Sequence, residues 1–409
     1  MPRLWLVNQF ANTPELPGHT RQYEVAAGLV QQGWAVDVFA SDFNLTQRRY
    51  RRLRFPQLWT SERPTGIRWS WLWVSPYKGN DWKRQLNMAS FCVHLLLRLL
   101  LVGFIGRIAG GGPDLILASS PQLPAAWTCL WIARALGVPF VLEVRDLWPQ
   151  VLIDQGGKSP RSSMVRLLAW MERQLYRGAH IVVVLAKGAE IYVQERGARH
   201  TTWLPNGPDL DLFQLQALTA DNSLFTVLYA GAHGDANALD NVIEAARLLE
   251  QNIASNIRFI FIGDGPEKQA LILQAEGLSN VHFENPVPKA QIPALMAKAD
   301  AILLSLRDVP LFRYGVSPNK LYDAYALGRP VITTVAGAIN EEVEEHRVGV
   351  TAPPGDPQAL VLAITKLAST PRIEREAMAQ RARHLAETTY SRQRINARYN
   401  ELLREVIAE

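Results

Sequence analysis

The chain has 409 residues, of which 48% are hydrophobic and 20% are charged. This length predicts two or three domains, and the apolar content suffices for large cores, which excludes extended disorder, collagen and a disulfide scaffold. The formal net charge of +5 is unevenly distributed, because residues 1–200 carry +11 and the remainder −6. The basic half is therefore expected to face an anionic partner: a phosphate-bearing substrate, a membrane surface or nucleic acid.

In the first half, short apolar runs typical of buried parallel strands alternate with amphipathic stretches typical of helices. The predicted strands are Leu4–Val7, Ala35–Ala40, Ile67–Val74, Leu115–Ala118, Phe140–Val144 and Ile181–Val184. The predicted helices are Arg21–Gln32, Gln85–Ile108, Ala125–Leu136, Ser163–Arg177 and Ala189–Arg196.

The second half repeats this alternation. Its predicted strands are Thr226–Ala230, Arg258–Ile262, Val281–Phe283, Ala301–Ser305 and Val331–Thr333. Its predicted helices lie near 238–251, 266–276, 291–298 and 319–327, and a last helix is expected over Ser391–Ala408.

The stretch Leu204-Pro-Asn-Gly-Pro-Asp209 separates the halves and predicts a linker. We therefore expect an α/β protein with two Rossmann-like, doubly wound parallel-sheet domains facing each other across a cleft. The N-terminal domain is expected over 1–205 and the C-terminal domain over 206–385, with a helix in 386–409 returning to the first domain. Such sheets bind ligands beyond the carboxyl ends of their strands, so the site is expected there.

Two cysteines, Cys92 and Cys129, lie in apolar runs without the spacing of a metal site. This usage suggests a reducing compartment. Met1–Val7 lacks the charged and apolar regions of a secretory signal, and we expect a cytoplasmic protein.

The segment Phe91–Ile108 is apolar apart from His94, Arg98 and Arg107. A central Arg disfavours a membrane span, which leaves either a buried helix or a helix lying at the bilayer interface. Nearby Arg and Trp residues favour contact with an anionic lipid surface, because indole rings prefer the headgroup level. They are Arg48, Arg49, Arg51, Arg52 and Arg54, followed by Trp59, Trp69, Trp71, Trp73 and Trp82.

Two motifs in the first half could carry chemistry. A glycine loop at Gly18 precedes a helix whose first amides could hold an anion, although no Gly-x-Gly-x-x-Gly or Walker A pattern is present. Arg145 and Asp146 end a predicted strand. Asp146 could accept a proton or orient a hydroxyl there, or the two residues could form a structural ion pair.

In the second half, two strands end in glycine turns and a polar stretch opens a later helix. Each motif is expected to present backbone amides and one polar side chain at the rim of the cleft. The motifs read Leu228-Tyr-Ala-Gly-Ala-His-Gly234, Phe261-Ile-Gly-Asp-Gly-Pro-Glu267 and Ser317-Pro-Asn-Lys-Leu-Tyr-Asp323.

With these motifs in this order, the chain resembles the retaining glycosyltransferases of family 4, which have the two-domain GT-B fold. The matching motifs are the Gly18 loop, Asn206-Gly207, Tyr229-Ala-Gly231, Gly263-Asp-Gly-Pro266 and Lys320 through Pro330. Glu143–Pro149 and Ser317–Asp323 resemble, more narrowly, the bacterial O-antigen and capsule branch of N-acetyl-fucosamine-type transferases. This resemblance implies transfer from a UDP-sugar to a polyprenyl-diphosphate-linked glycan at the inner, anionic membrane face, with no nucleic acid as partner.

The same resemblance implies roles for single residues. Asp323 matches the family's second acidic position, whose carboxylate holds the ribose hydroxyls, whereas Gly315 stands where the family usually has Glu. The family's usual cations for the diphosphate are also missing, so Lys320 or Arg313 is expected to meet it. Catalysis is assigned to Asp146, Arg145 and Lys320.

The full set of predicted donor-binding residues is Gly18, Gly231, His233, Gly234, Gly263, Gly265, Arg313, Asn319, Lys320, Leu321 and Asp323. The predicted membrane or acceptor residues are Arg48, Arg49, Arg51, Arg52, Trp71 and Trp73.

Other functions stay open at this point. One is a nucleotide-sugar epimerase of the same fold, another a nucleic-acid- or anion-binding protein that uses the basic half, and a third an inactive scaffold suggested by Gly315. Asp209-Leu-Asp211 has the spacing of a metal–nucleotide site, but no further oxygen ligands cluster beside it in the sequence. Neither a metal nor a cofactor is expected.

Overall fold

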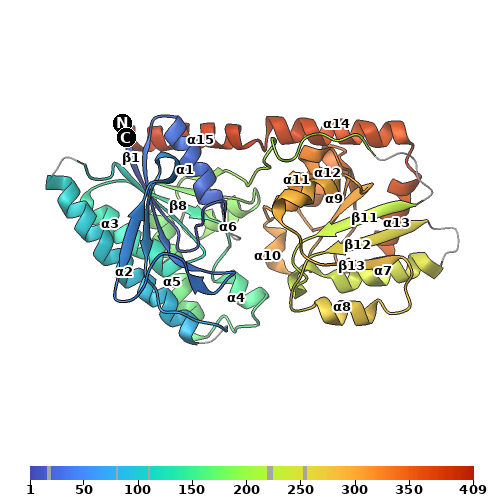
Figure 1. Ribbon diagram of the computed structural model, residues 1–409, viewed down its shortest axis with the longest axis horizontal. Helices are drawn as coiled ribbons and strands as arrows, with labels where there is room; N and C mark the ends of the chain where they lie inside the picture. The colour runs from blue at the N-terminus through green and yellow to red at the C-terminus, as the bar shows by residue number, and fades with distance from the viewer. Residues whose placement is uncertain (16–19, 80–81, 109–110, 219–223, 252–255) are drawn as a thin grey trace. The chain divides into compact units, whose positions relative to one another are not determined.

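The structure is a computed structural model that describes residues 1–15, 20–79, 82–108, 111–218, 224–251 and 256–409. The chain forms two compact units, Met1–Leu204 with Ile395–Glu409, and Pro205–Arg394 (Figure 1). The first boundary lies one residue before the predicted one. The boundary predicted between residues 385 and 386 lies after Arg394 instead. The reason is that α14 (Arg372–Thr388) packs against α11 (Asn319–Leu327) inside the second unit.

The first unit contains an eight-stranded sheet in the order β10-β9-β8-β7-β1-β2-β6-β5, parallel except for the edge strand β5. The order reverses between β1 and β7, which is where a doubly wound sheet places its ligands. A separate hairpin joins β3 and β4. The strands are β1 (Arg3–Val7), β2 (Ala35–Ser41), β3 (Phe43–Asn44), β4 (Arg49–Tyr50), β5 (Trp59–Glu62), β6 (Arg68–Leu72), β7 (Leu115–Ser119), β8 (Phe140–Val144), β9 (Ile181–Val184) and β10 (Thr201–Trp203).

Helices cover both faces of this sheet (Figure 1). Leu4 and Leu6 of β1 pack in one cluster with side chains of α1 and α15. Trp5, which points to the opposite face, lies near Gly103 of α2 and Leu136 of α3. The helices are α1 (Arg21–Gln31), α2 (Trp82–Ile108), α3 (Leu123–Leu136), α4 (Gln150–Asp154), α5 (Ser163–Gly178), α6 (Ala189–Glu195) and α15 (Arg392–Ala408).

The tryptophans of β6 belong to the core. Trp69 and Trp71 are 0% and 1% exposed, and their rings stack with centroids 4.7 Å apart. They share a face because side chains two residues apart on a strand point the same way. The prediction that Trp71 contacts a membrane or an acceptor is therefore wrong. Trp73 is half-buried and stacks on Tyr50.

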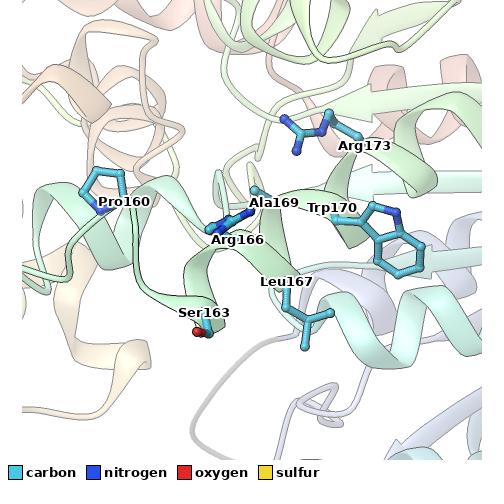
Figure 2. A pocket seen from close by; sticks show the side chains of 7 residues that line it. All are labelled: Pro160, Ser163, Arg166, Leu167, Ala169, Trp170 and Arg173. Carbon is cyan, nitrogen blue, oxygen red and sulfur yellow. The ribbon is translucent and has the colours of Figure 1, made fainter.

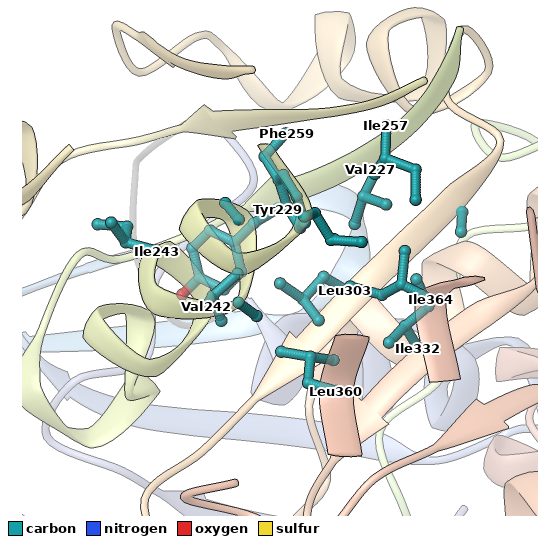
Figure 3. Packing of buried hydrophobic residues seen from close by; sticks show 14 of the residues in the cluster. Val227, Tyr229, Val242, Ile243, Ile257, Phe259, Leu303, Ile332, Leu360 and Ile364 are labelled. Atoms are coloured by element: carbon teal, nitrogen blue, oxygen red, sulfur yellow. The ribbon is translucent and has the colours of Figure 1, made fainter. Parts of the chain in front are cut away.

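The second unit has a six-stranded parallel sheet in the order β13-β12-β11-β14-β15-β16, reversing between β11 and β14. Its core lies between the sheet and the pair α7 and α13 (Figure 3). The strands are β11 (Phe225–Ala230), β12 (Ile257–Ile262), β13 (Val281–Glu284), β14 (Ala301–Ser305), β15 (Val331–Thr334) and β16 (Gly349–Thr351). Besides α11 and α14, the helices are α7 (Leu239–Gln251), α8 (Lys268–Gln274), α9 (Ile292–Met296), α10 (Pro310–Arg313), α12 (Ala338–Glu345) and α13 (Pro357–Ser369).

Candidate active site

The glycine turns after β11 and β12 approach each other closely. A Cβ atom on Gly263 would lie 1.9 Å from the carbonyl oxygen of Gly231, and one on Gly265 would lie 2.3 Å from that of His233. Only glycine allows this approach of the two backbones. The amide of His233 donates to the carbonyl of Asp264 at 2.9 Å. The structure thus brings Gly231, His233, Gly263 and Gly265 together at the carboxyl edge of the sheet.

The amine of Lys320 lies against these turns. Lys320 belongs to the first turn of α11, and its Nζ lies 3.9 Å from the ring centroid of Tyr229. A Cβ atom on Gly231 would lie 2.8 Å from the same Nζ. Within the described residues, this amine has no hydrogen-bond acceptor and no carboxylate beside it. Burial lowers the pKa of Lys320 to about 7. A desolvated cation at a helix N-terminus, without an anion, is suited to bind one.

His233 has unused hydrogen-bonding capacity. It is 0% exposed, and neither ring nitrogen has a hydrogen-bond partner within the part of the chain that the structure describes. Burial lowers its pKa, and the charges of Lys268 and Lys320 add to this. The imidazole is therefore neutral near pH 7. Lys268 is itself satisfied, because its Nζ donates to the carbonyls of Gly263 and Glu284 at 2.8 and 2.9 Å.

The remaining predicted donor residues are distributed along the same elements. Asn319 is exposed at the start of α11, and Asp323 is half-buried one turn later. Leu321 is 1% exposed, so its side chain belongs to the core. Only its backbone could make the predicted contact with the nucleotide. Gly234 is half-buried beside His233.

Two predicted donor residues stand apart from this group. Arg313 is exposed at the end of α10 and pairs with Asp308 at 3.2 Å, so its charge is partly neutralised. Gly18 lies outside the residues that the structure describes.

Two motifs of the second unit are joined by hydrogen bonds. The amide of Asn206 donates to Ser317 Oγ at 2.9 Å, and its side chain donates to the carbonyl of Ser317 at 2.7 Å. These bonds anchor the loop that precedes α11.

In the first unit, Glu143 is the centre of a buried polar network. Its carboxylate accepts from Arg21 Nε at 2.9 Å, Tyr399 OH at 2.5 Å, Ser119 Oγ at 2.7 Å and Gln22 Nε2 at 3.1 Å. This network was not among the predicted features. The signal was present in Glu143, a charged residue inside the otherwise apolar strand β8.

The predicted catalytic pair of the first unit adjoins this network. Arg145 Nη1 donates to Gln22 Oε1 at 3.3 Å, and its amide donates to Ser120 Oγ at 3.1 Å. Asp146 follows β8 and is exposed. These contacts hold Arg145 at the carboxyl end of β8, beside Asp146.

The predicted basic cluster is partly neutralised by acidic neighbours. Arg52 contacts Glu62 at 2.6 Å and lies over the ring of Trp71, and Arg51 lies 3.6 Å from Glu15. Arg48 lies over the ring of Tyr77, and Arg49 donates to Gln47. Only part of this cluster is therefore available to an anionic surface.

The Asp209-Leu-Asp211 motif serves a local role. Asp209 pairs with Arg392 at 2.9 Å and accepts hydrogen bonds from the amides of Asp211 and Leu212. Across the described ranges, no three His, Cys, Asp or Glu side chains gather as a metal site would require.

Two family models match the chain. "Glycosyl transferase 4-like domain" matches residues 18–207, and "Glycosyl transferases group 1" matches residues 225–370. The chain is 25% identical to a glycosyltransferase named WbjE of Pseudomonas aeruginosa, over 64% of this chain and 65% of that protein. The chain thus spans slightly less than two thirds of the length of WbjE. It is 26% identical to WcaI of Escherichia coli K12, named for colanic acid biosynthesis, over 83% of this chain and 86% of that one.

Solved structures match over nearly the full length. Sucrose-phosphate synthase from Thermosynechococcus elongatus has a TM-score of 0.73 at 17% identity, covering 100% of both chains. Anabaena HepE in complex with UDP has a TM-score of 0.68 at 18% identity, covering 99% of this chain and 100% of that one. These similarities establish the fold.

The fold is thus that of the GT-B glycosyltransferases, as predicted. With a glycosyltransferase 4-like domain followed by a group 1 domain, the chain belongs to the glycosyltransferases, and it is an enzyme.

Proposed function

We propose that this glycosyltransferase moves a sugar of N-acetylhexosamine type from a UDP-sugar to a polyprenyl-diphosphate-linked glycan, with retention, at the inner face of the membrane. The donor is supported by HepE, a structure with the same fold that was solved in complex with UDP. The polysaccharide setting is supported by relatives named for colanic acid biosynthesis. The sugar and the lipid-linked acceptor are supported only by the resemblance of the motifs at Glu143–Pro149 and Ser317–Asp323 to the O-antigen and capsule branch.

The observation that carries this proposal is the amine of Lys320, which has no acceptor among the described residues and lies beside the glycine turns of β11 and β12. In sugar transfer, negative charge develops on the departing diphosphate. A cation and backbone amides held in place before the reaction stabilise that charge without reorganisation. Asp323, one turn along α11, would accept hydrogen bonds from the ribose hydroxyls.

Ligand-dependent thermal stability tests the proposal. At 100 times its dissociation constant, a ligand stabilises the folded protein by about 2.7 kcal/mol, a readily measured rise in Tm. UDP and UDP-N-acetylhexosamines are expected to raise the Tm, whereas ADP and CMP leave it unchanged. A rise with ADP and none with UDP would contradict the UDP donor, and product analysis after incubation with a lipid-linked acceptor tests the transfer itself.

Replacing Asp323 by Ala is expected to weaken UDP binding roughly 10–100-fold, the range for a hydrogen bond to a charged group. Turnover at saturating donor should change little, because a ribose contact is made equally in the ground and transition states. Titration calorimetry with UDP measures the first effect and steady-state kinetics the second. Glu374→Ala is the matched control, because it removes an exposed carboxylate on α14 and should change neither property.

UDP affinity is also expected to depend on pH. The pKa of Lys320 is lowered to about 7 by burial, so the ammonium form predominates below pH 7 and is lost above it. Because the ammonium form attracts the diphosphate, the UDP dissociation constant should rise by up to about tenfold per pH unit above 7. Calorimetry across this range measures it, and the Lys320→Ala variant should lack the dependence. Equal slopes in both proteins would assign the titration to another group.

A further inference from the structure

Helix α2 exposes an apolar face to solvent. By length and composition, one helix among the described residues, over Trp82–Gly103, could cross a membrane. Only 28% of its most apolar window is buried in the protein, so most of it is at least partly exposed. Phe91, Leu95 and Leu99 are fully buried against the first unit, so this helix is part of the fold. The opposite side is open, with Leu97 and Leu101 48% and 43% exposed. Pulling α2 across a bilayer would uncover the buried side, which favours a helix lying flat on a surface.

Two neighbouring helices extend this surface. Helix α3 packs between α2 and α5. Trp131 of α3 is 50% exposed, and Leu167 and Trp170 of α5 are 56% and 45% exposed. The ring of Trp127 lies 5.8 Å from that of Trp131 and 5.9 Å from that of Trp170, so one aromatic row joins α3 to α5. We name the exposed side chains of these helices the α2–α3–α5 face.

This face carries positive charge and no exposed acid. In the sequences of the three helices the only Asp or Glu is Glu172, which is 2% exposed and lies 3.8 Å from Arg196. Exposed basic residues stand among the apolar ones: Lys83, Arg134, Arg166, Arg173 and Arg177. Along α5, Arg166, Trp170 and Arg173 line a shallow groove of about 630 Å³ (Figure 2). Its guanidinium groups suit a phosphate group.

We infer that the α2–α3–α5 face docks the enzyme on an anionic lipid bilayer, with leucines of α2 and the Trp row entering the headgroup level and Arg166 and Arg173 meeting lipid phosphates. This inference deepens the proposed function, because it names the surface by which the enzyme reaches a lipid-linked acceptor. Helices that lie at a membrane surface typically combine tryptophan, arginine and leucine in this way. A symmetric contact with a second copy would place these cations against one another without any exposed acid to pair them. The face shares α2 with the prediction, because Phe91–Ile108 is one candidate for a helix at the bilayer interface, but it does not include the predicted residues from Arg48 to Trp73.

Co-sedimentation of the full chain with phosphatidylcholine vesicles, with and without phosphatidylglycerol, tests the inference. Binding should require the anionic lipid and weaken at high salt, since screening shortens the reach of surface charge. Arg166→Gln with Arg173→Gln should lower the partition coefficient roughly 25-fold, at about fivefold per arginine. Leu97→Asn with Leu101→Asn should lower it at least roughly tenfold through lost apolar insertion.

Matched controls locate the surface. Arg48→Gln with Arg49→Gln removes two exposed arginines elsewhere in the first unit, and Leu362→Asn with Ile373→Asn removes two exposed apolar groups of the second. Both controls should bind vesicles like the wild type. A larger loss in either control, or equal binding to neutral vesicles, would overturn the inference. A dimer that Leu97→Asn with Leu101→Asn dissociates, without vesicle binding, would assign the face to a second copy and overturn it too.

The UDP-dependent rise in Tm should be the same in all these variants, because none of the changed residues belongs to the glycine turns after β11 and β12 or to α11. Loss of vesicle binding with UDP binding intact bears on the docking surface alone. Failure of UDP to raise the Tm of the wild type would instead count against the proposed function and leave the vesicle result standing.

Discussion

Replacing Lys320 by Ala is expected to lower turnover roughly 10²–10³-fold, the usual loss when a donor aimed at developing charge is removed. The amine lies against Gly231 and over the ring of Tyr229, where the carboxyl ends of the parallel strands place ligands. Of the predicted donor-site cations, Arg313 is exposed and already paired with Asp308. Lys320 would therefore carry most of the stabilisation of the departing diphosphate. Steady-state kinetics with a UDP-sugar measures the loss.

Thermal stability separates this role from a structural one. Burial disfavours the ammonium form of Lys320, and within the described residues no acid compensates it. Removing the amine should therefore leave the Tm unchanged or raise it while activity falls, a combination typical of functional residues. A structural role predicts a lower Tm instead. Lys298→Ala, an exposed lysine of the same unit, is the control and should keep both properties. Full turnover and unchanged UDP affinity in Lys320→Ala would make Arg313 or Arg145 the candidate.

The sheets were predictable because parallel strands buried on both faces form continuous apolar runs. All predicted strands are present, from Leu4–Val7 to Val331–Thr333. Strands β5 and β10 lie at the edges of the first sheet, and β16 at an edge of the second; none of the three was predicted. Edge strands are short and partly polar, so they lack that signal. The alternation of Trp69 and Trp71 along β6 indicates a shared core face, whereas the Trp and Arg content of the same region favours lipid contact, and the two signals conflict.

The candidate site was predictable only in part. Glycine after an apolar run marks a turn at the carboxyl end of a strand, and this signal identified Gly231 and Gly263. The packing of Lys320 on Tyr229 depends on how α11 meets β11, which no local pattern contains. The bond from Tyr399 to Glu143 joins residues 256 positions apart, beyond the reach of any periodicity.

The second large effect is expected in the stability of the first unit. Replacing Arg21 by Met should lower the free energy of unfolding by about 3–5 kcal/mol, the cost of leaving one partner of a buried ion pair without the other. Arg21 and Glu143 are 7% and 2% exposed, and their contact distance is 2.9 Å. Met keeps much of the side-chain volume, so the loss reflects charge and hydrogen bonding more than a cavity. Urea unfolding followed by tryptophan fluorescence measures it.

The same network predicts a pH dependence. Burial opposes ionisation of Glu143, but the charges of Arg21 and Arg145, with hydrogen bonds from Tyr399 and Ser119, outweigh it and lower its pKa to about 2. A carboxylate with a depressed folded-state pKa contributes stability that is complete above its unfolded pKa of about 4.3. That contribution is lost as the pH falls from there towards 2. Glu143→Gln should show a flatter decline in unfolding free energy over this window.

Two further variants make the Arg21 prediction specific. Arg51→Ala removes a more exposed pair with Glu15 in the same unit and should cost about 0–1 kcal/mol. Combining Arg21→Met with Glu143→Leu should recover part of the loss, because no charge is then left buried alone. If Arg21→Met cost no more than Arg51→Ala, Arg145 alone would neutralise Glu143.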